Sequence, residues 1–358
     1  MRVLQLIDSL RPGGAERMAL NLTNSLSRHI EYSGICVTRE KGSLTGQLDP
    51  QTGYLFLKKE SAIDVRALIN LYRFIKRNKI NIVHAHGTSF FTGSIIKIFT
   101  PHLKLIWHDH LGGRINKKRS AYPTLYLCSI LFDGVLTVNK ELAEWVRKNL
   151  RTKKTAYIPN FLVSKFIENF NKKDKECNSD ILKIICLANL KNPKNHLNIL
   201  RAFKIVNEKF PEVELLLVGK KYHDDYQKSL EQYIRENKLQ KKIFLTGEKP
   251  EGIIYLMESC IGVISSDSEG LPMALLEYGA AKLAVVSTNV GACPEVIGND
   301  GQLVETDNSD ALAKAILFYL EDEEARMRDA KNFNDKILSS YSQEIVLPQI
   351  INFYYQIQ

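Results

Sequence analysis

The sequence predicts an α/β protein of two domains, each built around a parallel β-sheet with helices on both faces. Its 358 residues exceed what one hydrophobic core usually serves, which favours two domains. Short apolar runs alternate with helical patterns, and the alternation restarts after a polar stretch at 164–180. The runs are almost continuously apolar, which is typical of strands whose two faces are both covered by helices.

In the first half, the spacing of apolar residues predicts alternating strands and helices. The expected strands are 2–7, 33–38, 54–57, 81–86, 103–108 and 133–138, and the expected helices include 15–28, 64–78 and 140–149. The stretch 164–180 has little to bury and is interpreted as a linker or domain edge.

The second half repeats the pattern. The expected strands are 182–187, 213–219, 242–247, 261–265 and 283–288, and the expected helices include 195–209 and 224–237. Two such domains in tandem create a cleft, and ligands of parallel sheets bind at the carboxyl ends of the strands.

The composition is that of an ordinary folded protein, with 44% hydrophobic and 25% charged residues. No apolar run approaches the roughly 18 residues that a membrane-spanning helix needs, and the first residues are too briefly apolar for a signal peptide. Six scattered cysteines without a CxxC pair are interpreted as buried thiols. We therefore expect a cytoplasmic protein.

The charge is uneven along the chain. Residues 1–160 carry 25 Lys and Arg against 11 Asp and Glu, whereas the remainder is net acidic. The basic residues cluster at 73–79, 114–119 and 147–154. These clusters are either solvated helix ends or a surface facing an anionic membrane or a phosphate-bearing substrate. No nucleic-acid recognition pattern is present in the sequence, so we expect no nucleic-acid partner.

Two loops point to phosphate binding. Gly13 and Gly14 follow the first strand and open a helix, where the backbone can approach a ligand closely; the alternative is a simple strand–helix turn. The pattern is not GxGxxG, which disfavours a dinucleotide. In the second half, Lys194 precedes a helix, a place that favours a cation only if an anion lies nearby. The alternative for Lys194 is a solvated side chain.

The segment at 265–280 places two carboxylates around a helix start. Glu269 precedes Gly270, Pro272 fits the first helical turn, and Glu277 follows about one and a half turns deeper. Carboxylates accept hydrogen bonds from pairs of hydroxyls, and helix-start amides bind an anion. This layout suits a molecule with two polyols joined by a diphosphate, which is the layout of a nucleotide-sugar. The alternative is a capping or solvated pair.

These motifs together resemble the retaining GT-B glycosyltransferases of family 4. The signature E-x7-E corresponds to Glu269 and Glu277. The other segments that resemble the family are "GGAER" (13–17), "IVHAH" (82–86), "TVNKELAEWV" (137–146), "YIPN" (157–160), "ANLKNPKNH" (188–196), "VGACPEVI" (290–297) and "GQLV" (301–304). The resemblance covers most of the chain. It implies an N-terminal acceptor-binding domain at 1–163, a donor-binding domain at 164–340, and a C-terminal helix at 341–358 that packs back on the first domain.

The resemblance also implies roles for individual residues. Glu277 would hold the ribose hydroxyls of the donor, and Glu269 with the amides of Gly270 and Leu271 would hold the transferred sugar. Lys194 would neutralise the diphosphate leaving group. The remaining donor-binding residues implied are Gly13, Gly14, Asn189 and Pro272. The family often has Arg where this chain has Asn189, and Asn supplies hydrogen bonds but no charge.

Two His-x-His pairs end predicted strands. His84 with His86 and His108 with His110 could bind zinc, because side chains at i and i+2 of a strand share a face. The family resemblance implies instead that His108 or His110 contacts the donor sugar, and His110 is favoured slightly because it lies nearer the Gly112–Gly113 turn. For His84 and His86, strand-end packing is the plain interpretation.

We therefore expect a hexosyltransferase-type glycosyltransferase that works with retention of configuration and without a metal or other cofactor. Asp267 and Glu269 approach a metal-binding DxD pair but overlap the E-x7-E motif. The expected partners are a nucleotide-sugar, a glycan or polyprenyl-diphosphate-linked acceptor of surface polysaccharide or lipopolysaccharide synthesis, and the inner face of the plasma membrane. The alternatives are a sugar-nucleotide hydrolase or epimerase, an inactive nucleotide-sugar-binding protein, and a metal hydrolase.

Overall fold

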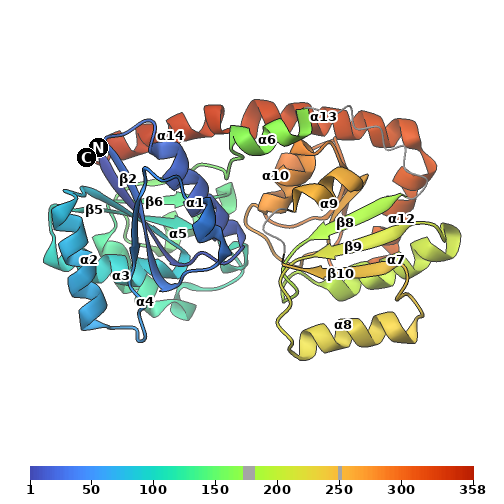
Figure 1. Cartoon of the computed structure of the whole chain (residues 1–358), viewed down its shortest axis with the longest axis horizontal. Helices are drawn as coiled ribbons and strands as arrows, with labels where there is room; N and C mark the ends of the chain where they lie inside the picture. Colours follow the sequence, from blue (N-terminus) through green and yellow to red (C-terminus); the bar gives the residue numbers. More distant parts are fainter. Residues whose placement is uncertain (172–181, 249–251) are drawn as a thin grey trace. The chain divides into compact units, whose positions relative to one another are not determined.

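A computed structural model describes residues 1–171, 182–248 and 252–358 (Figure 1). The chain forms two compact units, of which the first comprises Met1–Val163 with Gln343–Gln358 and the second comprises Ser164–Ser342. The second unit is therefore inserted, in sequence, into the first.

The first unit contains a seven-stranded parallel sheet in the order β3-β2-β1-β4-β5-β6-β7. Its strands are β1 (Arg2–Ser9), β2 (Tyr32–Glu40), β3 (Gly53–Phe56), β4 (Ile82–His86), β5 (Lys104–Asp109), β6 (Gly134–Thr137) and β7 (Thr155–Tyr157). All six strands predicted for this half are present, and β7 is an additional edge strand. Chain order reverses between β1 and β4, the kind of position at which parallel sheets bind ligands.

Helices cover both faces of this sheet. One face packs against α1 (Gly14–Leu26) and α14 (Gln343–Tyr355), and the other against α2 (Val65–Arg77), α3 (Phe90–Phe99), α4 (Pro123–Cys128) and α5 (Lys140–Asn149). Short 3-10 helices connect these elements at η1 (Ser43–Gln47), η2 (Gly87–Ser89), η3 (Gly112–Arg114), η4 (Arg119–Ala121) and η5 (Ser129–Leu131). The two apolar layers bury the strands on both sides, as their continuous apolar runs predict.

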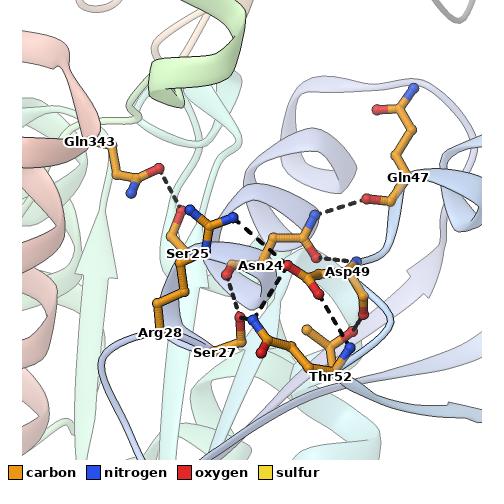
Figure 2. A network of polar contacts seen from close by, with 9 residues as sticks. Asn24, Ser25, Ser27, Arg28, Gln47, Asp49, Thr52 and Gln343 are labelled. Carbon is orange, nitrogen blue, oxygen red and sulfur yellow. Dashed lines mark hydrogen bonds and ion pairs between the residues drawn. The ribbon is translucent and has the colours of Figure 1, made fainter.

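The C-terminal helix α14 is fastened to the start of the first unit. Ser25 of α1 donates a hydrogen bond to Oε1 of Gln343 at 2.9 Å, and Figure 2 shows this contact beside a network around Asn24 and Asp49. The Asn24 amide donates to the carbonyl of Gln47 and its oxygen accepts from the backbone of Asp49, which ties the η1 loop to α1. Apolar residues of α14 then pack on β1, β4 and β5.

The second unit contains a six-stranded parallel sheet in the order β10-β9-β8-β11-β12-β13. Its strands are β8 (Lys183–Leu187), β9 (Glu214–Val218), β10 (Ile243–Gly247), β11 (Ile261–Ile264), β12 (Ala284–Thr288) and β13 (Gln302–Val304). Its helices are α6 (Ser164–Asn171), α7 (His196–Lys209), α8 (Asp225–Glu236), α9 (Ile253–Glu258), α10 (Met273–Ala280), α11 (Cys293–Ile297), α12 (Ser309–Glu321) and α13 (Glu323–Tyr341). The fold class predicted from the sequence, two parallel-sheet α/β domains, is confirmed.

Three sequence-based expectations need correction or restriction. Residues 164–171 are not linker but form α6, because Ile167 and Phe170 share an apolar face and are buried. Residues 172–180 of that stretch, with Cys177, lie outside the described residues. Four cysteines are free thiols, as expected, namely Cys36, Cys128, Cys186 and Cys293. Cys260, however, is disulfide-bonded, so the expectation of a thiol was wrong there.

Candidate functional site

In the second unit, chain order reverses between the neighbouring strands β8 and β11. These two strands pair through Ile184 and Ile185 and then separate toward their carboxyl ends. The Tyr278 hydroxyl bridges the gap, accepting from the backbone N–H of Leu187 at 2.7 Å and donating to the carbonyl of Val263 at 3.2 Å. Such a switch point is where open parallel sheets bind their ligands.

The two glutamates of the E-x7-E segment follow β11, beside this switch point. β11 ends at Ile264, and a loop carrying Glu269 leads to α10, in which Glu277 immediately precedes Tyr278. The side chain of Glu269 is 9% exposed, and Glu277 is 5% exposed. Both carboxylates are therefore largely shielded from water, and they lie near the point where chain order reverses in the sheet rather than on a fully solvated surface.

The backbone around Glu269 is held by a second loop. Ala292 N–H donates to the carbonyl of Gly270 at 2.9 Å. Gly291 has φ +53°, and a Cβ there would lie 2.1 Å from the carbonyl oxygen of Glu269. Pro272 precedes α10 with an extended backbone instead of occupying its first turn, and Leu271 beside it is buried. The loop therefore has little freedom to move Glu269.

Lys194 contacts Glu269 directly. Nζ of Lys194 lies 2.6 Å from Oε1 of Glu269, and the hydroxyl of Ser266 donates to the same oxygen at 2.6 Å. The Ser265 hydroxyl and the Asp267 N–H bind carbonyls of the lysine loop. Lys194 precedes α7, as the sequence predicts, and the structure brings it together with the first glutamate of the motif.

Asn189 connects the ends of two neighbouring strands. Its Oδ1 accepts from the backbone N–H of Lys220 at 2.9 Å, which joins the loops after β8 and β9. Nζ of Lys220 lies 4.9 Å from the ring centre of Tyr222, and Nζ of Lys191 lies 6.0 Å from it. Two lysines therefore gather around the loop in which family members often carry Arg. Sequence reasoning missed Lys220 because it follows a different strand, whereas Lys191 lies in the same loop as Asn189.

In the first unit, Gly13 and Gly14 lie where β1 meets α1. Gly13 is the N-cap of α1, its backbone is extended, and a Cβ there would lie 2.3 Å from Oε2 of Glu16. Gly14 is exposed. The structure therefore places the two glycines at a strand–helix junction, as predicted. Glu16, in the first turn of α1, puts a carboxylate beside them.

The four histidines form one cluster at the carboxyl ends of β4 and β5. His86 and His108 are register partners on adjacent strands. The rings of His84 and His86 stack with centres 4.6 Å apart, and those of His108 and His110 with centres 4.1 Å apart. The first three are fully buried, whereas His110, just beyond β5, is half-buried. The structure therefore places both candidate sugar contacts, His108 and His110, in the same stack.

Burial makes these rings weak bases. Removal from water lowers the pKa of His84 and of His110 to about 3, and the neighbouring His110 lowers that of His84 further. The pKa values of His86 and His108 are lowered for the same first reason, burial, and then by the other histidines. All four are therefore neutral near pH 7 and can donate or accept hydrogen bonds but supply no positive charge.

Three of these histidines could be considered as metal ligands. One ring nitrogen from each of His84, His86 and His108 lies within 4.8 Å of the others. Tetrahedral zinc, with its nitrogens at 2.0–2.1 Å, brings ligand nitrogens to about 3.4 Å from one another. The stacked rings would have to turn to reach that geometry, and both nitrogens of His86 already contact other side chains. The rings as they stand therefore do not have zinc-site geometry, although Nε2 of His84 and both nitrogens of His108 have no hydrogen-bond partner among the described residues.

A buried ion pair holds the loop after His110. Nε of Arg114 donates to Oδ2 of Asp109 at 2.7 Å, and the guanidinium packs among three aromatic rings. Arg114 is 7% exposed, so it does not belong to the basic surface expected for 114–119. Lys117, Lys118 and Arg119 of that segment are exposed.

Both units of the chain match known families of glycosyltransferases. Residues 167–335 match the family "Glycosyl transferases group 1", and residues 12–163 match "Glycosyltransferase Family 4". A capsular polysaccharide biosynthesis glycosyltransferase, CapH of Staphylococcus aureus, is 25% identical over 83% of both chains. An Escherichia coli UDP-Gal:alpha-D-GlcNAc-diphosphoundecaprenol alpha-1,3-galactosyltransferase is 26% identical over 92% of this chain and 90% of the relative.

Solved structures share the two-sheet architecture. HepE of Anabaena, crystallised with UDP and glucose, superposes with a TM-score of 0.84 over 99% of both chains at 16% identity. A glycosyltransferase from Rickettsia africae superposes with a TM-score of 0.81 over 99% of this chain and 98% of its own. These likenesses establish the GT-B architecture.

Proposed function

Because this chain belongs to the group 1 glycosyltransferases of family 4, we propose that it transfers a hexose from a nucleotide-diphosphate-sugar to a glycan or polyprenyl-diphosphate-linked acceptor with retention of configuration. The observation that carries this proposal is the pairing of Lys194 with Glu269 at the switch point of the second sheet, near which the buried Glu277 also lies. A cation and two buried carboxylates at one switch point provide partners for a diphosphate and for two sets of hydroxyls.

Each of the site residues contacts a different part of the donor in this proposal. Glu277 accepts from the ribose hydroxyls, and Glu269, with the amides of Gly270 and Leu271, holds the transferred sugar. The ammonium of Lys194 stabilises the negative charge that develops on the leaving diphosphate. The acceptor oxygen bonds to the anomeric carbon on the face from which the diphosphate oxygen departs, and that departing oxygen takes the acceptor proton. No divalent metal takes part in this scheme.

A second cation compensates for Asn189. Lys220 and Lys191 lie near the Tyr222 ring, and the backbone of Lys220 is fixed by the Asn189 side chain. We assign to Lys220 the second positive charge toward the diphosphate. A lysine supplies this charge as a point charge rather than through a planar fork.

The relatives suggest the chemical class of both substrates. The E. coli relative is named for UDP-Gal and a diphosphoundecaprenol-linked sugar, and HepE was crystallised with UDP and glucose. We therefore propose a UDP-hexose donor, a polyprenyl-diphosphate-linked acceptor, and a place in capsular or lipopolysaccharide-type surface polysaccharide synthesis.

The surface of the first unit supports docking on the anionic inner face of the plasma membrane. α3 packs between α2 and α4, and the sequences of these three helices contain no Asp or Glu. Their outer sides, with the adjoining η5, expose large apolar side chains, namely Val65, Ile69, Tyr72, Ile98, Phe99, Leu127 and Ile130, which we call the apolar face. Exposed cations lie on α2 or against Tyr126 of α4, namely Arg66, Arg73, Lys76, Arg77, Arg119 and Arg151. Apolar anchors with neighbouring cations suit an anionic lipid surface.

Among the residues that the structure describes, none of the helices combines the length and apolar character needed to cross a bilayer. Membrane docking is tested by vesicle flotation. The wild type should float with vesicles containing phosphatidylglycerol and not with pure phosphatidylcholine. The double variant Ile98→Glu/Phe99→Glu should lose flotation, whereas Met327→Glu, an equally exposed residue of the second unit, should retain it. Equal flotation of both variants would contradict docking through the apolar face.

The transferase itself is tested with purified protein, UDP-glucose, UDP-galactose or UDP-N-acetylglucosamine, and a synthetic polyprenyl-diphosphate sugar. The expected result is an extended lipid-linked product with retained configuration, unaffected by EDTA and abolished in Glu269→Gln. Release of free sugar without acceptor would support the hydrolase. Nucleotide binding without turnover would support the inactive binding protein, and loss of activity with EDTA would support metal chemistry.

A further inference from the structure

A line of buried polar side chains crosses the first sheet from α14 to the end of β5. Oη of Tyr354 lies 2.7 Å from Nδ1 of His84, and Nε2 of Gln5 donates to the same hydroxyl oxygen at 3.5 Å. Oε1 of Gln5 lies 2.9 Å from Nε2 of His86, whose Nδ1 lies 3.0 Å from Nε2 of His110. We call these five residues the Gln5 chain. They come from β1, β4, the end of β5 and α14, and four of them are buried.

The positions of the protons along the Gln5 chain follow from one another. A neutral imidazole has one N–H and one bare nitrogen. The amide oxygen of Gln5 can only accept, so Nε2 of His86 carries the proton and its Nδ1 is bare. Nε2 of His110 must then donate to that bare nitrogen, which leaves Nδ1 of His110 as a lone-pair acceptor.

The same reasoning applies at the Tyr354 end of the Gln5 chain. Gln5 donates its amide N–H to the oxygen of Tyr354, and the tyrosine hydroxyl can in turn donate to Nδ1 of His84. Turning the Gln5 amide by half a turn would reverse every proton, including the one on His110. The tautomers of His86 and His110 are therefore coupled, and the orientation of the Gln5 amide in β1 selects between them.

The bare nitrogen of His110 still lacks a donor. Its Nδ1 is shielded from solvent and has no hydrogen-bond partner among the described residues. A buried acceptor without a partner costs free energy, so such atoms mark places where a ligand or water completes the structure. A sugar hydroxyl is a donor of the required kind.

We propose that Gln5 and Tyr354 are positioning residues that hold His110 in the tautomer with a bare Nδ1, so that this nitrogen accepts a hydrogen bond from a sugar hydroxyl. The second clause rests on the proposed glycosyltransferase function, whereas the tautomer is a property of the protein alone. In this arrangement α14 contributes to the site, because its Tyr354 orients side chains on β1 and β4. His110 serves as an acceptor in this arrangement and not as an acid.

The test uses full-length protein labelled with ¹⁵N-histidine, whose two ring nitrogens report the tautomer in long-range ¹H–¹⁵N spectra at pH 7.5. A His110→Gln variant assigns the resonances. The wild type should show Nε2–H and a bare Nδ1 on His110. Gln5→Leu should give a mixture of both tautomers, as should Tyr354→Phe, which removes only a hydroxyl and serves if Gln5→Leu does not fold. The control Tyr355→Phe, at a neighbouring exposed position, should match the wild type.

Activity supplies the second readout. Both variants should lower kcat about tenfold, the worth of one hydrogen bond, while the Kd for the nucleotide diphosphate stays unchanged. A proton on Nδ1 of His110 in the wild type, or an unchanged tautomer in both variants, would overturn the proposal. A shift of the histidine resonances on adding EDTA would assign the cluster to a metal and also overturn it. Absence of sugar transfer by the wild type would overturn the proposed function alone, because the spectra are recorded without substrate.

Discussion

The ammonium of Lys194 and the carboxylate of Glu269 are 2.6 Å apart, although 75 residues separate them in the sequence. The lysine therefore has a charge partner before any donor arrives, and a bound diphosphate would share it. The ion pair also joins the loop before α7 to the loop before α10, which form the two parts of the proposed donor site.

Replacing Lys194 tests its role at the leaving group. Lys194→Gln should lower kcat by about 10²–10³-fold, the usual effect of removing one preorganised donor from a developing anion. The KM for the donor should change less, because the charge grows as the bond breaks. Steady-state kinetics with saturating acceptor measure both quantities. Lys204→Gln, an exposed position of α7, is the control; an equal loss there, or no loss at Lys194, would contradict the assignment.

Replacing Glu277 tests the ribose contact. Glu277→Gln should raise the Kd for the nucleotide diphosphate by roughly 10- to 150-fold, since a hydrogen bond to a charged group is worth about 1.5–3 kcal/mol. Isothermal titration calorimetry measures the affinity, and thermal unfolding checks that the variant is folded. The exposed Glu324→Gln variant should bind as the wild type does. Unchanged affinity of Glu277→Gln would place the ribose elsewhere.

Gly291 is predicted to control the position of Glu269. Gly291→Ala introduces a Cβ that would lie 2.1 Å from the carbonyl oxygen of Glu269, at a residue with φ +53°. It should destabilise the protein by about 1–3 kcal/mol and also weaken donor binding, because the glutamate loop must shift. Gly247→Ala is the matched control, since Gly247 has φ +77° and open space around it. That control should lose stability in urea unfolding while keeping its affinity for the nucleotide.

The histidine cluster should make the first unit sensitive to acid. Burial lowers the pKa of His84 and His110 to about 3, against an ordinary value of 6.5. Below pH 6.5 these histidines are therefore protonated in the unfolded chain but stay neutral in the folded unit. The free energy of unfolding accordingly decreases as the pH falls from 6.5 toward 3. The loss between pH 7.5 and 5.5 should be about 1.4 kcal/mol for each such histidine.

Tryptophan fluorescence isolates this effect, because both tryptophans of the chain, Trp107 and Trp145, lie in the first unit. Urea unfolding of His84→Gln should depend less on pH than that of the wild type. His102→Gln, at an exposed position, should retain the full dependence. A wild-type midpoint that is the same at both pH values would refute the prediction.

The strands were predictable because their apolar runs are long and local. The short edge strand β7 was missed because Thr155–Tyr157 is only half-buried, and α6 was missed because its polar residues outnumber its apolar ones. For the site, E-x7-E marked Glu269 and Glu277 from sequence alone, but no local pattern shows that Lys194 reaches Glu269, since that contact depends on the order of strands in the sheet.

The Gln5 chain was equally out of reach, although one signal existed. Gln5 interrupts the apolar run of β1 and is completely buried, and a buried amide needs partners. Nothing in the sequence reveals that one partner is Tyr354, because α14 returns to the first sheet only after the whole second unit has been formed.

That return has a consequence for biosynthesis. A ribosome releases all six strands of the second sheet before it releases α14, which covers Val3, Ile82 and Ile106 of the first. During translation the earlier domain must wait with one face of its sheet covered by α1 but not yet by α14, while the later domain can close independently. The domain that is synthesised first is therefore the last to complete its fold. A chaperone that shields that face during the delay would act on the nascent chain before release.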